Sequence, residues 1–174
     1  MTRVRRTARR AAAVVVGLVA ALAAVLLGAS EWRLRTRYDV PAERPLPIRD
    51  DAGTRARGAH LARAVATCVL CHGEDLGGAV YLDAGALGFV AGPNLTRGRG
   101  GVGTRLGDAD WERAVRHGVR RDGTSLLVMP SEIYAGLSDE DLGAIVAYAR
   151  AAPPVDRVLP PSRLRPLGRA LLAA

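Results

Sequence analysis

The segment Cys68-Val69-Leu70-Cys71-His72 places two thiols and an imidazole within five positions of this chain of 174 residues. Its two cysteines are three residues apart, and positions i and i+3 of a helical turn lie on one face. Both thiols could therefore reach the two vinyl groups along one edge of a porphyrin, and the imidazole of His72 could bind the iron. The spacing predicts a c-type haem attachment site with thioether bonds at Cys68 and Cys71. The chain contains no other cysteine that would compete for these roles.

Two other chemistries use a pair of cysteines at this spacing. A thioredoxin-like redox disulfide follows a strand in a βαβ unit, and the sequence around Cys68 shows no such pattern. A structural zinc ion needs four cysteine or histidine ligands, and the chain offers only His60 and His117 beyond the motif. Both interpretations stay open as alternatives, but haem attachment fits these residues better.

An iron held in this way needs a second axial ligand from elsewhere in the chain. The chain has two methionines, Met1 and Met129, and Met1 belongs to the N-terminal end. Met129 precedes Pro130, which restricts it to extended backbone conformations and would help to hold a ligand loop. We therefore expect Met129 as the distal ligand, the alternative being a core methionine that fills a gap. His117 is the rival ligand, but we expect it, like His60, at the surface.

Length and composition allow one domain with terminal extensions. Aromatic residues make up 4% of the chain, so a core made only of protein would lack large apolar side chains, which a buried porphyrin could supply. The net charge of +8 comes mainly from the termini, because residues 51–152 hold 11 arginines against 12 acidic side chains. The basic composition is therefore not the footprint of a nucleic-acid-binding protein, and we expect no nucleic-acid partner.

Residues 11–29 form an uninterrupted run of 19 uncharged, apolar or small residues. As a helix the run would be about 28 Å long, close to the thickness of the hydrocarbon core of a bilayer. The five arginines in residues 1–10 predict a cytoplasmic basic segment by the positive-inside rule. We expect a transmembrane anchor in a bacterial inner membrane, with the rest of the chain in the periplasm. A cleaved signal peptide is the alternative.

Proline-rich segments flank a domain that we place at residues 51–152. Residues 30–50 are expected to form an extended spacer between membrane and domain. Residues 153–174 are expected to form a solvated tail, with a helical turn or two at its end.

Within the domain the hydrophobic pattern is helical, with no convincing alternating strand. We predict a first helix over 51–71, a middle helix over 108–117 that Asp108 could cap, and a last helix that Ser138 caps. Segment 73–107 holds 11 of the 20 glycines of the chain. A loop of this length is unusual in a small domain, but it is reasonable when wrapped around a prosthetic group.

Five segments in order along the chain carry a family resemblance: Cys68–His72, Gly92–Thr96, Asp110–Val119, Val128–Ser131 and Leu137–Tyr148. Together they resemble a class I cytochrome c, of the bacterial membrane-anchored monohaem type related to haem subunits of periplasmic dehydrogenases. The resemblance covers roughly residues 53–155. It implies an all-α fold of three to five helices around one covalently attached haem c, in addition to the N-terminal transmembrane helix.

The resemblance also implies roles for single residues. It implies His72 as the proximal and Met129 as the distal ligand of the haem iron. The carbonyl of Pro93 would accept a hydrogen bond from the other ring nitrogen of His72, which fixes the ring and raises its basicity. The first and last helices would cross near Gly58 and residues 143–148.

One departure from the family pattern concerns the haem propionates. Relatives commonly place an aromatic residue just before the middle helix, and Arg105-Leu106-Gly107 stands there in this chain. Three arginines become candidate partners of the propionates: Arg97, Arg99 and Arg105.

These expectations describe a single-electron carrier without catalytic residues. Ligation by histidine and methionine favours reduced iron and raises the reduction potential, and two filled axial positions leave no place for substrate or oxygen. We expect a quinol-oxidising complex or an exported dehydrogenase as the electron donor, and a terminal oxidase or reductase as the acceptor. The alternative is a haem sensor or catalytic haem protein in which Met129 leaves the iron or never binds it.

Overall fold

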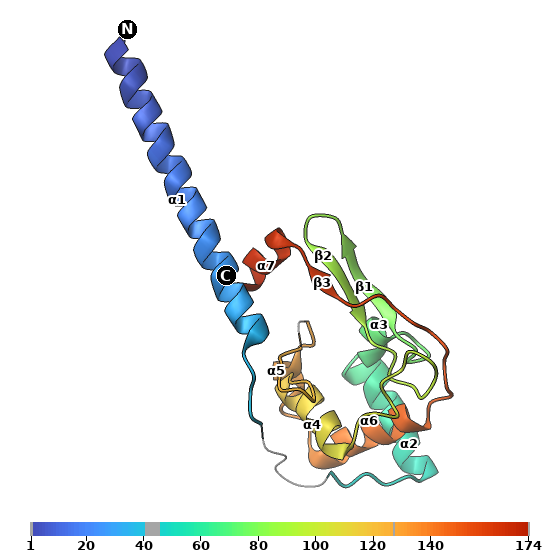
Figure 1. The fold of residues 1–174 in the computed structure, drawn as a ribbon. Coiled ribbons are helices and arrows are strands. Elements are labelled where there is room, and N and C mark those ends of the chain that lie inside the picture. The colour runs from blue at the N-terminus through green and yellow to red at the C-terminus, as the bar shows by residue number, and fades with distance from the viewer. Residues whose placement is uncertain (1, 41–45, 127, 174) are drawn as a thin grey trace.

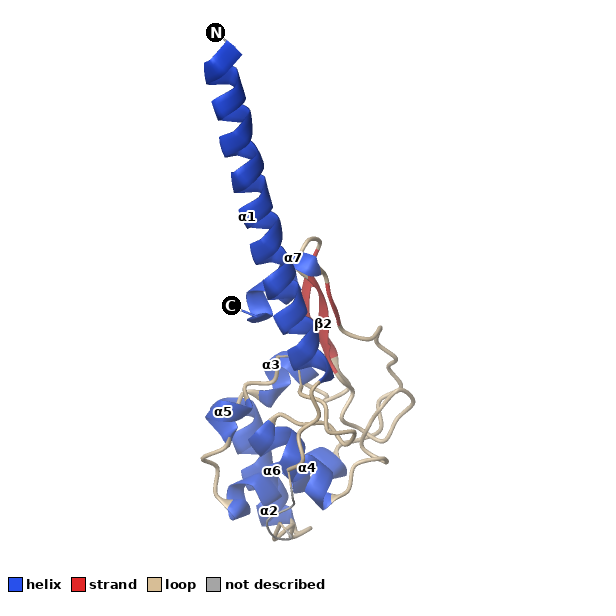
Figure 2. Cartoon of the chain, turned by 60° about the vertical axis from the view of Figure 1, so that its left-hand side comes forward, coloured by secondary structure: helices blue, strands red, loops and turns tan. Residues whose placement is uncertain are grey.

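The computed structural model describes residues 2–40, 46–126 and 128–173, so Met1 lies outside the described residues. Helix α1 (Thr2–Arg35) projects away from the other elements, which gather beside its C-terminal end (Figure 1). Figure 2 shows the same arrangement after a turn, with the strands beside the lower end of α1 and most of the short helices below it. In the described part of the chain, α1 alone is long and apolar enough to cross a membrane.

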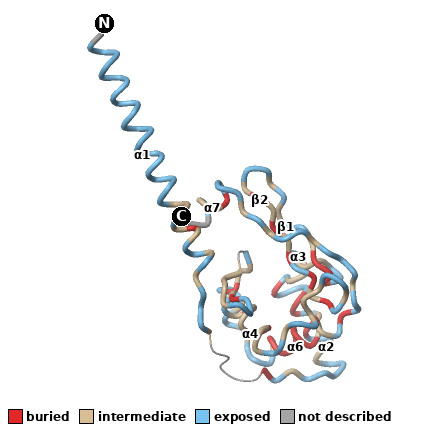
Figure 3. The backbone as a smooth tube through the Cα atoms, viewed as in Figure 1, coloured by how far each residue is buried: buried red, intermediate tan, exposed pale blue. Residues whose placement is uncertain are grey.

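The remaining helices are much shorter than α1, and one of them, α3 (Cys68–His72), carries the cysteine motif. They are α2 (Ala52–His60), the π-helical turn η1 (Leu61–Val65), α3, α4 (Asp108–His117), α5 (Ser131–Tyr134), α6 (Asp139–Ala151) and α7 (Pro166–Ala173). Buried positions concentrate in α6 and the elements around it, whereas α1 is exposed over most of its length (Figure 3). The large apolar side chains of the main core are Leu46, Leu76, Trp111, Val115, Leu142 and Val146.

The predicted first helix over 51–71 is divided into three pieces. Helix α2 passes into η1, where the backbone N–H of Ala66 bonds to the carbonyl of Leu61, 2.7 Å away. Thr67 then takes a left-handed conformation with φ +48°, which ends the helical run. The cysteines therefore sit on a separate turn, α3, whose direction is set by this break. A π-helical turn at such a position is common next to functional sites.

Helices α2 and α6 cross in close backbone contact. A Cβ atom on Gly58 would lie 1.9 Å from the carbonyl oxygen of Ala144, so only glycine allows this approach. The predicted crossing of the first and last helices near Gly58 is confirmed. Gly143 serves a different contact, because a Cβ atom there would lie 2.9 Å from the carbonyl oxygen of Pro47.

The ends of α4 and α6 lie close to their predicted positions. The hydroxyl of Ser138 accepts a hydrogen bond from the backbone N–H three residues on, at 3.1 Å, as predicted for this cap. Helix α4 begins at Asp108, but this residue does not cap it. Gly107 is the N-cap, and its backbone N–H donates to the carboxylate of Asp110 at 3.1 Å. Gly118 ends the helix with φ +63°.

The expectation of an all-α fold is wrong in one respect, because a small antiparallel sheet is present. Strands β1 (Ala79–Ala84) and β2 (Gly88–Gly92) form a hairpin, and β3 (Arg163–Leu164) pairs with β2. A register shift between Val80 and Leu82 interrupts the alternation of faces in β1. The segment therefore lacks a regular two-residue hydrophobic period, which is why its sequence predicts a loop in place of these strands.

Most described residues of the C-terminal tail are exposed, as predicted, and it ends in helix α7, but the tail also makes specific contacts with the domain. The guanidinium of Arg157 lies 2.9 Å from the carboxylate of Asp75. The side-chain amide of Asn94 donates to the backbone carbonyl of Val155 at 2.7 Å. The prolines at positions 153, 154, 160 and 161 disfavour a helix between α6 and α7. The backbone there is not helical, and its carbonyls at Val155 and Arg157 accept hydrogen bonds from the side chain of Asn94.

The predicted spacer over residues 30–50 also differs from an extended linker. Residues 30–35 continue helix α1. The backbone N–H of Tyr38 bonds to the loop after α4 at 2.8 Å, and Leu46 is buried in the core with 6% exposure. Two prolines of the spacer, Pro41 and Pro45, lie outside the described residues. The described parts of this segment therefore connect α1 to the domain through packed contacts.

Candidate haem site

Helix α3 is a single turn held between two sharp bends of the backbone. Thr67 precedes it with φ +48° and Gly73 ends it with φ +80°. A Cβ atom on Gly92 would lie 2.0 Å from the carbonyl oxygen of Cys71. The end of β2 can therefore lie against α3 only because residue 92 has no side chain. This contact fixes the distance between the cysteine motif and the loop that follows β2.

Cys68 and Cys71 are free thiols, and both are partly buried. Burial raises the pKa of each thiol, so both are protonated near neutral pH. Reactive redox cysteines have lowered pKa values, so the thioredoxin-like alternative loses support. Within the described residues, no three His, Cys, Asp or Glu side chains group around a possible metal ion. The zinc alternative therefore loses support as well.

The Nδ1 atom of His72 lies 2.9 Å from the backbone carbonyl oxygen of Pro93. In the tautomer with its proton on Nδ1, the ring donates this hydrogen bond and leaves Nε2 free to bind a metal. Burial lowers the pKa of His72, and the bond to Pro93 opposes this shift only in part. The neutral imidazole is thus the favoured form. His60 and His117 are exposed, as expected for surface residues.

A buried polar network holds the loop after Pro93, and sequence reasoning missed it. Asn94 and Thr96 are 2% and 1% exposed. The side-chain oxygen of Asn94 accepts bonds from the backbone N–H and hydroxyl of Thr96, at 2.9 and 2.7 Å. Its amide nitrogen reaches the carbonyl of Val155, 61 positions along the chain. An asparagine after a proline indicates a turn, but nothing local in the sequence identifies so distant a partner.

Met129 is half-buried and packs against the main core cluster, as do Val69, Leu95 and Leu106. The carbonyl of Met129 accepts a hydrogen bond from the backbone N–H of Ser131 at 2.9 Å. The hydroxyl of Ser131 donates in turn to a backbone carbonyl of α4 at 3.2 Å. The loop that carries Met129 is therefore fastened to α4, while its side chain meets the same apolar cluster as α3.

The residues of this site fit a haem c. Two thiols at i and i+3, a neutral imidazole with a free Nε2 and a thioether form its usual donor set. The side chains of Val69, Leu95, Leu106 and Met129 all pack against the main core cluster but are only half-buried, so an apolar group bound there could cover more of their surface. Leu70 is 69% exposed, so the turn itself lies at the surface.

The residues suggested as partners of the propionates lie in solvent. Arg97, Arg99 and Arg105 are all exposed, and Arg105 bonds weakly to the carbonyl of Gly101 at 3.4 Å. Their role toward the propionates stays a prediction.

The helical domain and its Cys-x-x-Cys-His turn define a haem-binding protein of the cytochrome c class. The profile of a family described as "Cytochrome C oxidase, cbb3-type, subunit III" matches residues 53–148, which is more than half of the chain. The chain therefore belongs to this cytochrome c family, whose haem domains transfer electrons.

Curated relatives are cytochrome subunits of dehydrogenases. The gluconate 2-dehydrogenase cytochrome c subunit of Pantoea cypripedii is 40% identical over 98 residues, covering 53% of this chain and 22% of the relative. The cytochrome c subunit of the quinone alcohol dehydrogenase of Gluconacetobacter polyoxogenes is 33% identical over 104 residues, 56% of this chain and 22% of the relative. The fructose dehydrogenase cytochrome subunit of Gluconobacter japonicus is 33% identical over 128 residues, which cover 69% of this chain and 26% of the relative. The chain thus spans about a quarter or less of the length of these relatives.

Proposed function

We propose that the chain is a single-electron carrier that holds one haem c covalently, with His72 and Met129 as the axial ligands of the iron. The observation that carries this proposal is the geometry of α3. Cys68 and Cys71 are free on one turn, and the adjacent imidazole is turned by its 2.9 Å bond to Pro93 so that Nε2 is available.

Haem c would supply a reversible one-electron couple at its iron. Cys68 and Cys71 would hold one edge of the group, and Nε2 of His72 would bind one face. The carbonyl of Pro93 would keep the imidazole plane fixed and increase its basicity as a ligand. The thioether of Met129 on the other face would favour the reduced iron and raise the potential. With both axial positions filled by side chains, the site would pass electrons without binding substrate or oxygen.

The proposal includes a bacterial inner-membrane location with the domain in the periplasm. Helix α1 supports it, because residues 11–29 are apolar and a basic segment precedes them. We propose a retained anchor in place of a cleaved signal peptide, and N-terminal sequencing of the mature chain distinguishes the two. Tethering would raise the concentration of the domain near other membrane-bound redox proteins.

The relatives support a dehydrogenase catalytic subunit as the electron donor, since all three named above are dehydrogenase cytochrome subunits. A quinol-oxidising complex is a further candidate donor, and a terminal oxidase or reductase is the candidate acceptor. Adding each purified donor to membranes that contain the chain, and recording the reduced-minus-oxidised haem spectrum, would identify the physiological donor.

A redox titration followed by absorbance tests the carrier function. We expect one transition that follows the Nernst equation for one electron, and no binding of carbon monoxide by the reduced protein at neutral pH. Two separated transitions would contradict a single haem. Ready binding of carbon monoxide would favour the haem sensor or catalytic haem protein over a closed electron carrier.

A further inference from the structure

The C-terminal segment 163–173 comprises β3, which pairs with β2, and α7, which lies against the end of α1 nearest the domain (Figure 1). We propose that this segment binds the anionic lipid headgroups at the periplasmic surface of the membrane. It would give the domain a second contact with the bilayer, next to the anchor. The inference rests on the proposed membrane-spanning role of α1.

The segment is docked at one defined position on α1. From residue 3 to residue 25 every position of α1 is exposed. The positions that are at least half-buried begin at Leu26 and Leu27 and continue at Ala29, Ser30, Glu31 and Leu34, whereas Gly28, Trp32 and Arg33 stay exposed.

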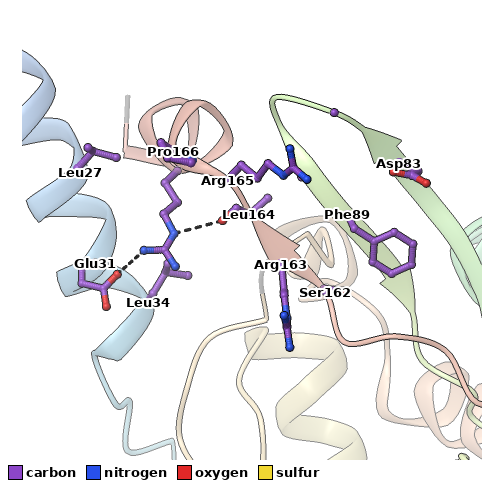
Figure 4. Close-up of a pocket in the computed structure, with 13 residues that line it drawn as sticks. Leu27, Glu31, Leu34, Asp83, Phe89, Ser162, Arg163, Leu164, Arg165 and Pro166 are labelled. Carbon is purple, nitrogen blue, oxygen red and sulfur yellow. Dashed lines mark hydrogen bonds and ion pairs between the residues drawn. The ribbon is translucent and has the colours of Figure 1, made fainter.

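An ion pair fastens the segment to this face. The guanidinium of Arg169 lies 2.8 Å from the carboxylate of Glu31 and donates to the carbonyl of Leu164 at 3.3 Å (Figure 4). At the preceding residue of α7, a Cβ atom on Gly168 would lie 2.2 Å from the carbonyl oxygen of Leu87. Helix α7 is therefore held between α1 and the turn of the β1–β2 hairpin.

The docking position corresponds to the level of the lipid headgroups. The apolar run of α1 ends at residue 29, and a helix of that length spans about one hydrocarbon core. Residues 30–35 then emerge on the periplasmic side. Trp32 is 71% exposed at this level, where interfacial aromatic side chains are expected. Helix α7, which packs beside residues 26–34, lies at the same depth.

The chemistry of the segment suits a lipid surface with negative charge. Leu167 and Leu171 are four residues apart on one face of α7 and are 52% and 62% exposed. Arg163 and Arg165 are exposed immediately before the helix. An interfacial helix combines such apolar side chains, which enter the acyl boundary, with basic residues that attract anionic headgroups.

A groove of about 920 Å³ lies between the segment, α1 and the hairpin. Apolar side chains from Leu27 and Leu34 line it on the side of α1, and Phe89 lines it on the side of the hairpin (Figure 4). Its charged lining consists of Glu31, Asp83, Arg163, Arg165 and Arg169. Because Glu31 is paired with Arg169, the remaining charge is two arginines against one carboxylate, which favours an anionic ligand.

Protection from trypsin tests the proposal on the full haem-loaded chain. The chain is reconstituted into vesicles of phosphatidylcholine alone or mixed with phosphatidylglycerol, and cleavage after Arg163 and Arg169 is followed by mass spectrometry; Arg165 precedes Pro166 and is not a trypsin site. Cleavage after Arg121, whose side chain is 71% exposed on the domain, is the internal reference. We expect the ratio of tail cleavage to reference cleavage to fall roughly fivefold in the anionic vesicles, the effect of about one arginine at such a surface.

The double variant Leu167→Ser/Leu171→Ser should remove this protection without undocking α7, because both side chains are exposed. Val158→Ser is the matched control, since Val158 is 68% exposed in the same tail but lies outside α7, and it should keep the protection. Equal cleavage ratios in the two lipids, or protection that survives the double variant, would overturn the proposal. Protection that rises with the protein-to-lipid ratio would indicate a second copy of the chain and would also overturn it.

Flotation of the same vesicles separates this proposal from the anchor. If the chain does not float with the lipid, the membrane-spanning role of α1 is refuted, and so is the proposed contact of the tail with lipid. Chain that floats but shows no lipid-dependent protection refutes the tail contact alone.

Discussion

Replacement of Gly92 by alanine should disturb the contact between β2 and α3 on which the site depends. The added Cβ atom would lie 2.0 Å from the carbonyl oxygen of Cys71, whereas ordinary contact begins at 3.4 Å. Because the obstructing atom belongs to the backbone, the strand and the helix must move apart. Overpacking of this kind costs about 1–3 kcal/mol. The movement would also draw Pro93, the next residue, away from the Nδ1 atom of His72.

The assay is guanidinium unfolding of the detergent-solubilised holoprotein, followed by far-ultraviolet circular dichroism. We expect the free energy of unfolding of Gly92→Ala to fall by about 1–3 kcal/mol. Gly85→Ala is the matched control, because a Cβ atom at this position of the same hairpin meets nothing within 4 Å. Its effect should stay within about 0.5 kcal/mol. If Gly92→Ala is as stable as Gly85→Ala, our reasoning about the contact between β2 and α3 is wrong.

Three further predictions concern the distal ligand, the helix crossing and the tail. Met129→Ala should keep its haem but lose the far-red sulfur-to-iron absorption band and bind carbon monoxide when reduced; retention of the band refutes the ligand assignment. Gly58→Ala should lower the free energy of unfolding by about 1–3 kcal/mol, because its Cβ atom would lie 1.9 Å from a backbone oxygen of α6, and unchanged stability would contradict this. Hydrogen bonds from Arg157 and from the backbone N–H of Gly77 lower the pKa of Asp75 below 3.8. The ionised carboxylate of Asp75 therefore stabilises the fold above that pH, and this contribution is lost as the pH falls through its lowered pKa. The melting temperature of Asp75→Asn should lie below that of the unsubstituted chain near neutral pH, and the difference should shrink in acid. A difference that does not depend on pH would contradict the ion pair.

The bounds of α4 and α6 and the cysteine motif could be predicted because their signals are local. Ser138 needs only the N–H three residues on to act as a cap, and the spacing of Cys68 and Cys71 is itself the signal. The crossing at Gly58 was also accessible, since the family resemblance implied it. The roles of the site residues toward haem stay predictions, although the bond between His72 and Pro93 has the geometry that they require.

The features that were missed depend on partners far away in the sequence. Val155 bonds to Asn94 across 61 positions, and no period or composition in the tail indicates this contact. Strand β3 is two residues long and gains its pairing only from β2. Thr67 takes a left-handed conformation that residues other than glycine rarely adopt, so the break in the first helix has no sequence signal. Tertiary contacts decided the structure at each of these positions.

The most direct test of the account is the mass of one peptide from the mature chain. Trypsin releases residues 64–97, which contain both cysteines together with His72 and Pro93. We predict that this peptide carries the added mass of one haem, bound at Cys68 and Cys71, after purification from a host that can attach haem c. A peptide of unmodified mass, from mature and exported protein, would contradict the central claim.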